Sequence, residues 1–549
     1  MNKMQFFRTD RSQLLIAAVV CVITFFVNNH VLVPDIMESR NIITAREMVY
    51  DGNWIIPTMN GELRFEKPPL PTWFAAVAEI ASPDDMAAQR FMAGLGALLL
   101  MAFFWKFSRH VLRLNPLVPT LLLCTCYNII LMGRTATWDI YCHAFMMAGI
   151  YFIATGLIAV RKSEVLRRLM LAGIFVGLSI MSKGPVSLYA LFLPFLIAYI
   201  WIYRPSVRGK APALVVMTLL ALVIGCWWYV YVHIAAADQL AAVVKKESGS
   251  WLNHNVRPWW YYWKFFLETG VWSLLLLTSM FLPLADKSRR KESRWLFSLI
   301  WMLGSLVLLS LMPEKKSRYL LPLLIPAAYL MGCMLVWWKK AFAATRAAKS
   351  DTVCFRINCW LLAAVVIALP VIAWFFAVVP GFVALWVWIV FSVISLACGW
   401  ALVSAAVGLK PYLMLGAVTV LFLVAECVGM PAVGKIVNNP DMKSIKAVRT
   451  DARLDNVPFY YIDTVPLRIE LVYAAGRKIR PVCPDTLRRV LPAALLTHEP
   501  LDSAIPPRLL HGMKLTETGV YDDNRRPKGN RRYSEEFIYH VTLIEDSLK

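Results

Sequence analysis

An acid and a base lie side by side in the stretch RFEKPPLPTW, where Glu66 and Lys67 follow an aromatic residue and precede two prolines. Proline stiffens the backbone and cannot continue a helix, so this stretch should be a rigid loop. A lysine on such a loop can bind a phosphate, and a carboxylate can orient or deprotonate a hydroxyl. The pair is therefore a candidate site for chemistry on a substrate that carries a phosphate.

Other charged side chains recur in the segments between long apolar runs. Several lie at the ends of these runs, where an unpaired charge is costly to hold in hydrocarbon. For any one of them, a snorkelling or helix-capping role is an alternative. Together they fall on one side of the membrane, and cations next to acids on that side indicate a site that binds an anion. The set consists of Glu38, Arg40, Arg134, Asp139, Lys183, His254, Arg257, Lys315, Lys316 and Arg318.

The elements that must position these residues are membrane helices. Of the 549 residues, 59% are hydrophobic and 17% are charged, whereas a soluble globular protein is about half apolar and about a quarter charged. Apolar runs about as long as a bilayer is thick recur along the chain, which indicates a polytopic membrane protein. We expect about 13 spans, at residues 13–33, 91–109, 116–132, 139–160, 168–182, 185–203, 211–235, 264–284, 295–312, 319–338, 358–379, 382–407 and 411–430.

The basic loops predict the orientation. The segments RHVLR, VRKSEVLRR, YRPSVRGK and DKSRRKESR fall on one side of the predicted spans, which the positive-inside rule makes cytoplasmic. This distribution accounts for the net charge of +22 without nucleic acid, for which the sequence has no zinc-ligand spacing or aromatic-basic groove. The first apolar run is too long for a signal peptide and should be an uncleaved helix. An odd number of spans then places the C-terminal tail outside the cytoplasm.

Two polar segments lie on the side away from the cytoplasm. Within a first outer loop at 34–90, SRNIITAREMVY and LPTWFAAVAEIA should be short helices along the membrane surface. The tail has strand patterns in PFYYID, IRPVC and FIYHVTLIE and a helix pattern in PLRIELVYAAGR. We therefore expect an all-α membrane domain over 1–430 and a small α/β domain of accessory role over 431–549.

An outward-facing site with acids and several cations suits a substrate that has a lipid tail and a phosphate. Arginine and lysine would bind the phosphate, and the tail would lie in a groove open to the bilayer. If a lipid phosphate is the leaving group, no nucleotide has to reach this side. The sequence accordingly has no glycine-rich phosphate loop.

The order of motifs along the chain resembles the GT-C glycosyltransferases of the protein mannosyltransferase and 4-amino-4-deoxy-L-arabinose lipid A transferase superfamily. The elements are MESRNIITAREM, GNWIIP, RFEKPP, TATWDIYCHAF, MSKGP, HNVRPWWYY and EKKSRYLLP, which cover most of residues 30–330. GNWIIP and FEKP are most similar to the aminoarabinose branch. The resemblance implies a GT-C fold in a bacterial inner membrane, with the site and the tail facing the periplasm. It also implies transfer of a sugar from a polyprenyl-phosphate carrier to lipid A, with a glycan hydroxyl or a protein Ser or Thr as alternative acceptors.

The resemblance further implies two catalytic acids. The family usually begins its first outer loop with Asp-Glu, two residues before an arginine, whereas this chain has Met37 and Glu38 before Arg40. Either Glu38 replaces the usual acid or Asp35 reaches the site from a differently shaped turn; the spacing favours Glu38. Asp139 matches the second acid, and we expect it to pair with Arg134 or Lys67.

The cations of the motifs resemble the family's phosphate-binding positions, with a solvated charge run or an interfacial aromatic belt as alternatives. Glu66 is expected to hold Lys67 in place, and Arg134, His254 and Arg257 are supporting residues. No cofactor is required; Glu38 and Asp139 could bind a divalent ion, but no compact ligand set specifies one. The expected phosphate ligands are Arg40, Lys67, Lys183, Lys315, Lys316 and Arg318.

A transporter or flippase for a lipid-linked anion is the alternative from another class of protein. It would predict internal repeats and charges near the middle of the membrane. The sequence shows no repeat, and its exceptional charges gather at one face. The enzyme is therefore the favoured hypothesis.

Overall fold

A computed structural model describes residues 10–253, 255–439, 441–531 and 533–547. The chain divides into two compact units, each taken by itself below. The described part of the first, the membrane unit, comprises residues 10–29, 65–71 and 86–430. The described part of the second, the sheet unit, comprises residues 30–64, 72–85, 431–439, 441–531 and 533–547.

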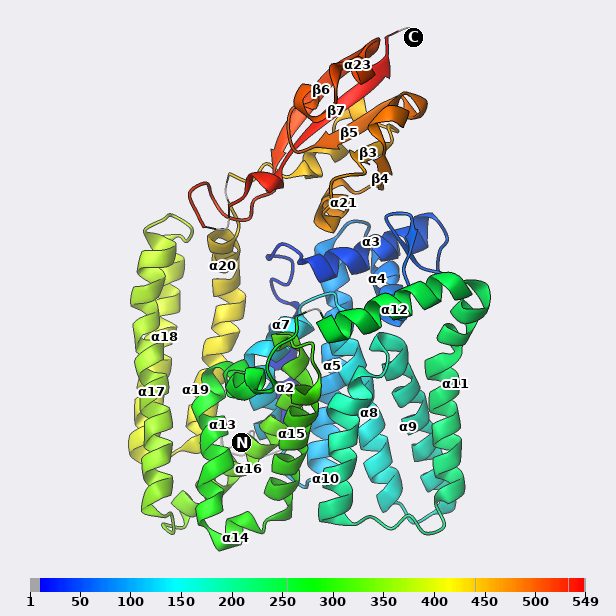
Figure 1. Ribbon diagram of the computed structural model, residues 1–549. Helices are drawn as coiled ribbons and strands as arrows, with labels where there is room; N and C mark the ends of the chain where they lie inside the picture. The colour runs from blue at the N-terminus through cyan, green and yellow to red at the C-terminus, as the bar shows by residue number, and fades with distance from the viewer. Residues whose placement is uncertain (1–9, 254, 440, 532, 548–549) are drawn as a thin grey trace. The chain divides into compact units, whose positions relative to one another are not determined.

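The membrane unit consists of long helices that run side by side (Figure 1). Among the described residues, ten helical segments are long and apolar enough to cross a membrane, and they match ten of the thirteen predicted spans. The other three predicted spans are also helical, but α2 is shorter, α6 and α7 are separated by a break, and η1 with α10 is a short segment. The bounds are α2 Asp10–Phe26, α5 Met86–His110, α6 Leu117–Cys124, α7 Tyr127–Gly133, α8 Trp138–Ile158, α9 Lys162–Lys183, η1 Leu188–Phe192, α10 Leu193–Tyr203, α11 Ala211–Ala235, α12 Ala237–Asn253, η2 Trp259–Trp272, α13 Ser273–Phe281, η3 Leu282–Ala285, α14 Lys287–Arg290, α15 Ser293–Leu311, η4 Ser317–Leu320, α16 Leu321–Ala343, α17 Lys349–Ala373, η5 Trp374–Val378, α18 Leu385–Gly408, α19 Pro411–Val424 and η6 Ala425–Gly429.

Helices α8 and α16 form the interior of this unit. Both are buried along most of their length, whereas α11 and α17 leave most of their apolar side chains exposed, as expected of helices that face lipid. Close approach at glycines packs the helices tightly: a Cβ on Gly149 would lie 2.8 Å from Val176, and one on Gly177 would lie 2.7 Å from Ile224. Small residues let membrane helices approach in this way. The result is a rigid α8–α9–α11 layer.

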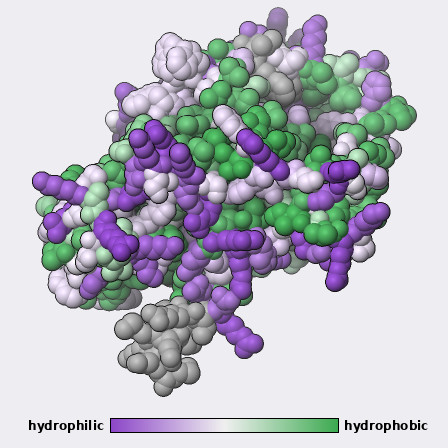
Figure 2. All heavy atoms as spheres, turned by 90° about the horizontal axis from the view of Figure 1, so that it is seen from below, coloured by the Kyte–Doolittle hydropathy of each residue, from purple (hydrophilic) through white to green (hydrophobic). Residues whose placement is uncertain are grey.

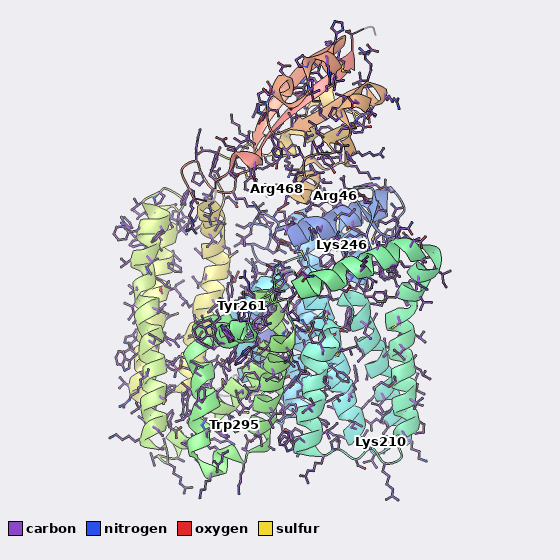
Figure 3. The ribbon with its side chains drawn as sticks, in the orientation of Figure 1. Arg46, Lys210, Lys246, Tyr261, Trp295 and Arg468 are labelled. Carbon is purple, nitrogen blue, oxygen red and sulfur yellow. The ribbon has the colours of Figure 1, made fainter. Side chains whose placement is uncertain are left out.

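The basic loops gather at one end of the membrane unit. Figure 3 places Lys210 and Trp295 at the end that carries α14, and Lys246 on α12 at the other end. Figure 2 looks onto the first of these ends, where long hydrophilic side chains project between apolar ones. Arg289 closes this end with a two-pronged ion pair to Asp351, with distances of 2.5 and 2.6 Å. The arrangement of charges is the one that the loop sequences predict.

The sheet unit is built on five strands in the order β4-β3-β5-β7-β6. Strand β3 is parallel to β4 and β5, and β7 is antiparallel to β5 and β6. Residues 30–85 add two helices and a small hairpin. The bounds are α3 Ile36–Tyr50, β1 Thr58–Met59, β2 Glu62–Leu63, α4 Leu70–Ala81, α20 Met430–Val437, η7 Ile445–Arg449, η8 Ala452–Leu454, β3 Phe459–Ile462, α21 Ile469–Ala475, β4 Ile479–Val482, η9 Pro484–Val490, β5 Ala493–Thr497, α22 Leu501–Ala504, α23 Pro507–Leu510, β6 Met513–Asp522, η10 Glu535–Phe537 and β7 Ile538–Asp546.

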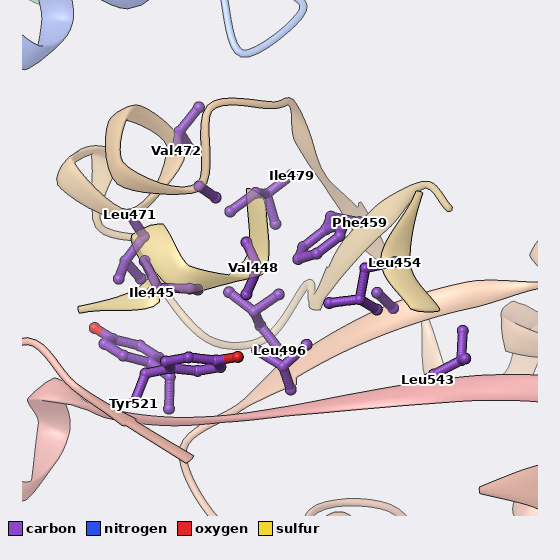
Figure 4. Close-up of a cluster of buried hydrophobic side chains, with 14 of the residues drawn as sticks. Ile445, Val448, Leu454, Phe459, Leu471, Val472, Ile479, Leu496, Tyr521 and Leu543 are labelled. Carbon is purple, nitrogen blue, oxygen red and sulfur yellow. The ribbon is translucent and has the colours of Figure 1, made fainter. Parts of the chain in front are cut away.

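Apolar clusters cover both faces of this sheet. Figure 4 shows one of them, in which Phe459 and Leu496 pack against Val448. Leu495, the neighbour of Leu496, belongs to the cluster on the opposite face, because successive side chains of a strand point to opposite sides. All five residues of β5 are buried as a result. The tail is thus a small α/β domain, as predicted.

The first outer loop folds together with the tail, which the sequence does not indicate. Asp84 forms ion pairs with Arg46 of α3 and with Arg449 of η7. The amide of Asn60 donates to the carbonyl of Ile479 at 2.7 Å, and its side-chain oxygen accepts from the Ile479 backbone N–H at 2.8 Å. The two predicted loop helices, α3 and α4, are confirmed. They form one compact unit with residues that lie about 400 positions further along the chain.

Candidate active site

The centre of the candidate site is a buried ion pair between two helix ends. Asp139 stands in the first turn of α8, and Lys183 is the last residue of α9. The two helices pack antiparallel, so the lysine ammonium meets the Asp139 carboxylate, and both side chains are almost fully buried. An acid at a helix N-terminus and a base at a C-terminus also suit the helix dipoles. The fold therefore holds both charges in fixed positions.

Aromatic and charged groups surround this pair. The Lys183 ammonium lies 5.1 Å from the ring centre of Tyr319, a cation–π contact. Arg318 and His143 act electrostatically on the same Asp139 carboxylate. His143 stands one turn further along α8, and its ring Nδ1 is buried without a hydrogen-bond partner. The cations of this cluster, Lys183 and Arg318, can attract a substrate anion, and the Asp139 carboxylate can hold the lysine ammonium in position.

The cations of the basic loop PEKKSR make different contacts. The Lys315 ammonium donates to the carbonyl oxygens of Arg257, at 3.0 Å, and Met312, at 2.5 Å. Burial lowers the pKa of Lys315. Two of its three donors therefore serve the loop itself. Lys316 instead pairs with Glu314 at 2.5 Å.

The first turn of η2 and the segment before it hold this loop in place. The backbone N–H of Lys316 donates to the hydroxyl of Tyr262 at 3.0 Å, and that hydroxyl donates to the Lys316 carbonyl at 3.1 Å. Val256 and Glu314 form an isolated antiparallel bridge. Arg257 keeps an exposed side chain and contributes its backbone. The predicted supporting residue His254 lies outside the described residues.

Glu66 and Lys67 belong to the same membrane unit. Phe65 anchors their loop by an edge-on contact with the ring of Trp228, with centres 6.3 Å apart. One carboxylate oxygen of Glu66 is buried without a hydrogen-bond partner. A buried acceptor of this kind is costly unless a ligand, a water or a cation satisfies it. The rigid loop predicted from the prolines therefore carries an acceptor that is ready for a donor.

Arg134 has a structural task in place of the expected pairing with Asp139. Its guanidinium donates to the carbonyl oxygens of Thr24 and Val27, both at 2.6 Å, and so caps the end of α2. It also lies 2.7 Å from the carboxylate of Glu426 in η6. Asp139 takes Lys183 as its ion-pair partner. The sequence offered Arg134 or Lys67 as the partner of Asp139. Arg134 does not take this role, because its guanidinium is engaged by two carbonyl oxygens and by Glu426.

The first predicted acids and Arg40 belong to the sheet unit. Asp35 is the N-cap of α3: its carboxylate accepts from the backbone N–H groups of Met37, at 2.9 Å, and Glu38, at 2.8 Å. Glu38 completes a capping box by accepting from the backbone N–H of Asp35 at 3.3 Å. Arg40 leaves a buried Nε without a hydrogen-bond partner. Both candidate acids thus take part in the cap, and Glu38 stays the proposed acid on its spacing to Arg40.

Four residues of the membrane-unit site were not predicted as site residues: Tyr319, Glu314, His143 and Tyr262. A tyrosine next to a basic loop and a histidine one turn after an acid are the signals that could have found the first and third. Among the described residues, no group of three or more His, Cys, Asp or Glu side chains is arranged to hold a metal ion.

Known proteins resemble this chain in sequence. The family described as dolichyl-phosphate-mannose-protein mannosyltransferase matches residues 66–229. An undecaprenyl phosphate-alpha-4-amino-4-deoxy-L-arabinose arabinosyl transferase of Pseudomonas fluorescens strain Pf0-1 is 27% identical over 59% of this chain and 57% of its own length. One from Proteus mirabilis is 26% identical over 59% of this chain and 60% of its length. The chain thus matches less than two thirds of each of these curated relatives.

Solved structures show the same fold. The crystal structure of ArnT from Cupriavidus metallidurans bound to undecaprenyl phosphate superposes with a TM-score of 0.65 at 18% identity, covering 97% of this chain and 98% of that one. The archaeal oligosaccharyltransferase AglB from Archaeoglobus fulgidus gives a TM-score of 0.50 at 11% identity, covering 86% of this chain and 64% of that one. The ten apolar helices of the described residues and this structural likeness define a polytopic membrane protein with the GT-C glycosyltransferase fold. Its resemblance to the superfamily of protein mannosyltransferases and aminoarabinose lipid A transferases is confirmed by sequence and by fold.

Proposed function

We propose that the protein is an integral-membrane glycosyltransferase that moves a sugar from a polyprenyl-phosphate carrier to an acceptor outside the cytoplasm. The buried Asp139–Lys183 pair beside Tyr319 and Arg318 carries the proposal. It lies at the ends of α8 and α9 remote from the basic connection between them. A charged cluster that is fixed at one membrane face and not at mid-membrane fits an enzyme better than a transport path.

The donor would bind through its phosphate. Lysine and arginine recognise phosphates by charge and by hydrogen bonds, and Lys183, Lys67 and Arg318 are the membrane-unit residues that we assign to this task. The relatives whose names specify undecaprenyl phosphate, and the ArnT structure bound to it, support a carrier of this chemical class. Arg40 is the proposed contribution of the α3 segment.

The reaction would be a displacement at the anomeric carbon of the sugar. An acceptor oxygen forms the new bond to this carbon, and the bond from the carbon to the carrier phosphate breaks, with its electron pair leaving on the phosphate. The cations stabilise the charge that grows on the leaving phosphate. Glu38 would accept the proton when the acceptor is a hydroxyl, and Asp139 would hold Lys183 toward the phosphate.

The acceptor that we propose is lipid A or another envelope glycolipid, on the strength of the aminoarabinose relatives. The match to the protein mannosyltransferase family supports a protein hydroxyl as the alternative. The two differ in their need for a base. A lipid A phosphate is already an anion and gives up no proton, whereas a Ser or Thr hydroxyl must lose one during the transfer.

We further propose that the site and the sheet unit face the periplasm of a bacterial inner membrane. The basic connections that precede α9, α11 and α15 lie at the other end of the membrane unit, which the positive-inside rule assigns to the cytoplasm.

Mass spectrometry of lipid A and of other envelope glycans tests this function. The cells to compare carry the wild-type gene, a deletion or the Lys183→Met variant, with Lys210→Met as a matched control at the opposite end of the membrane unit. We expect lipid A to lose a sugar-sized mass in the deletion and in Lys183→Met but not in Lys210→Met. A loss from a glycoprotein instead would move the acceptor to the protein alternative. No change in any glycan would refute the transferase and favour transport.

The Glu38→Gln variant separates the two acceptor classes in a transfer assay with purified protein. Glutamine keeps the shape of the side chain and accepts from the Asp35 N–H but cannot take a proton. With a hydroxyl acceptor, the rate should fall by about 10²–10⁴-fold. With a phosphate acceptor the fall should be much smaller, because no proton is transferred.

A further inference from the structure

The sheet unit contains a cavity of about 310 Å³ that plays no part in the proposed transfer. It opens at the carboxyl ends of the parallel strands β3 and β5. One wall runs from Tyr461 at the end of β3 to Leu467. The other is formed by Leu496 to Glu499 and by Ser503 and Ala504 at the end of α22. Tyr539 of β7 closes the third side. The size is in the range of pockets that hold small organic ligands, about 300–1,000 Å³.

The topology of the sheet explains why a cavity forms at this place. β3 lies between β4 and β5, and the chain leaves β3 through α21 toward β4 on one side. The chain leaves β5 through α22 toward strands that lie on the other side. Two neighbouring parallel strands whose connections depart in opposite directions leave a crevice between the connections, at their carboxyl ends. Ligands of α/β sheets bind in such crevices.

The chemistry of the lining narrows the class of ligand. The floor is apolar, from Ile462, Leu467 and Leu496, and two tyrosine rings add flat surfaces. The rim carries hydroxyl groups and one carboxylate. Among the lining residues, all of which the structure describes, there is no lysine or arginine. A phosphate or nucleotide needs cations or clustered N–H donors, so this lining suits a neutral ligand with polar groups around an apolar body.

His498 adds an oriented acceptor to the rim. Its Nδ1 lies 3.3 Å from the carbonyl oxygen of Ile538, which places the ring proton on Nδ1 and leaves Nε2 to accept. The imidazole also packs against the ring of Tyr539, with centres 4.7 Å apart. The Thr497 hydroxyl is occupied, because it donates to the carbonyl of Glu499 at 2.6 Å. Thr464, Ser503 and Glu499 remain exposed on the rim to meet ligand hydroxyls.

We propose that this cavity is a non-catalytic carbohydrate-binding site that takes one neutral sugar ring of a glycan. A pyranose or furanose ring has apolar C–H faces, which fit the aromatic and aliphatic floor, and hydroxyls around its edge, which fit the Thr464, Ser503, His498 and Glu499 groups. The inference goes beyond the proposed function, because it concerns the sheet unit alone and holds whatever the membrane unit transfers.

Saturation-transfer NMR with the full-length protein tests the proposal. The protein is held in lipid nanodiscs or in a detergent without a sugar headgroup, and the probes are methyl α-D-glucopyranoside, N-acetyl-D-glucosamine and L-arabinose. Concentrations of about 10 mM are appropriate, since a single ring is expected to bind with a Kd on the order of millimolar. At least one of the sugars should receive saturation from the wild-type protein.

Two obstructing variants and one control locate the binding. Ser503→Trp, on α22, and Thr464→Trp, on the opposite rim, fill the cavity from exposed positions and leave the apolar core intact. Asp502→Trp adds the same bulk to α22 beside the cavity without lining it. The transferred signal should fall by about tenfold in both obstructing variants, since the ring loses its contacts, and should persist in Asp502→Trp.

Each other outcome overturns the inference. If none of the sugars receives saturation from the wild-type protein, the cavity is not a sugar site. If the signal survives Ser503→Trp and Thr464→Trp, the sugar binds elsewhere, for example in the membrane unit. If inorganic phosphate at the same concentration broadens its ³¹P line with the wild-type protein and not with the obstructing variants, the cavity binds an anion. The Lys183→Met protein, whose substitution lies in the membrane unit, should retain sugar binding; loss of the signal there would overturn the assignment to the sheet unit.

Discussion

Replacing Lys183 by methionine tests whether the central ion pair serves function or only folding. Methionine keeps an unbranched side chain of similar length but removes the ammonium that faces Asp139. Both side chains are buried, so the substitution leaves a carboxylate without its cation. Breaking a buried pair in this way costs about 3–5 kcal/mol of folding free energy. The Lys183→Met protein should therefore unfold at a clearly lower temperature than the wild type.

The double variant Asp139→Leu/Lys183→Met separates the two roles. With both charges gone, no uncompensated carboxylate remains, and replacement of a buried pair by apolar groups is often neutral or stabilising. Most of the lost stability should return. The double variant, however, still lacks the Lys183 ammonium that we assign to binding the leaving phosphate. We expect the double variant to bind undecaprenyl phosphate about 100-fold more weakly than the wild type, which corresponds to about 2.7 kcal/mol of binding free energy.

The assay measures thermal unfolding and undecaprenyl-phosphate binding on the same detergent-solubilised samples. Lys210→Met is the matched control, because Lys210 donates to the Leu157 carbonyl at the other end of α8. It should leave binding unchanged. If the double variant recovers both binding and stability, the Asp139–Lys183 pair serves only folding, and the assignment of Lys183 to phosphate binding is wrong.

Substitutions of Asp35, of the Arg134–Glu426 pair and of Asp523 test three other assignments. Asp35→Ala should cost about 1 kcal/mol by removing the α3 cap, whereas Asp35→Asn should cost little; equal losses in thermal unfolding would contradict the capping role. Arg134→Gln should lower the free energy of unfolding by about 3–5 kcal/mol, because the Glu426 carboxylate stays buried without its cation. The double variant Arg134→Gln/Glu426→Gln should recover part of that loss; no recovery would show that the two side chains are not coupled. Burial raises the pKa of Asp523 to about 6. Folding therefore favours the protonated form of Asp523, so its stabilising contribution is present below about pH 4 and is lost as pH rises through about 6. The unfolding temperature of Asp523→Asn relative to wild type should rise over this pH range. A difference that stays constant with pH would refute the raised pKa of Asp523.

Local patterns predicted the elements that make their own contacts. The helix expected at LPTWFAAVAEIA has the bounds Leu70–Ala81 that its apolar run suggests. Likewise, α21 ends at Gly476, whose φ of 70° is accessible to glycine at little cost. The strands β5 and β6 were not predicted. β5 is buried on both faces and reads as a plain apolar run, which a short sequence window cannot assign to helix or strand.

Pairings between distant residues were the part that the sequence could not supply. Asp139 and Lys183 were both predicted to be site residues, but not as partners, because they are 44 positions apart. Their contact exists because α8 and α9 are antiparallel neighbours of similar length, which brings the start of one to the end of the other. From the sequence, the expected partner of Asp139 was Arg134 or Lys67. The ion-pair partner of Asp139 follows from the packing of α8 against α9, which local sequence patterns do not reveal.

The PEKKSR loop shows why a run of like charges is a weak predictor of ligands. By sequence alone its three cations are equivalent candidates for phosphate binding. In the structure, the Lys315 ammonium closes the loop on two carbonyl oxygens, and Lys316 pairs with Glu314. Arg318 is the member that acts on the Asp139 carboxylate. Because Lys315 binds the backbone of this loop, it can fix the position of Arg318. We therefore propose that Lys315 supports the phosphate site indirectly, by positioning Arg318.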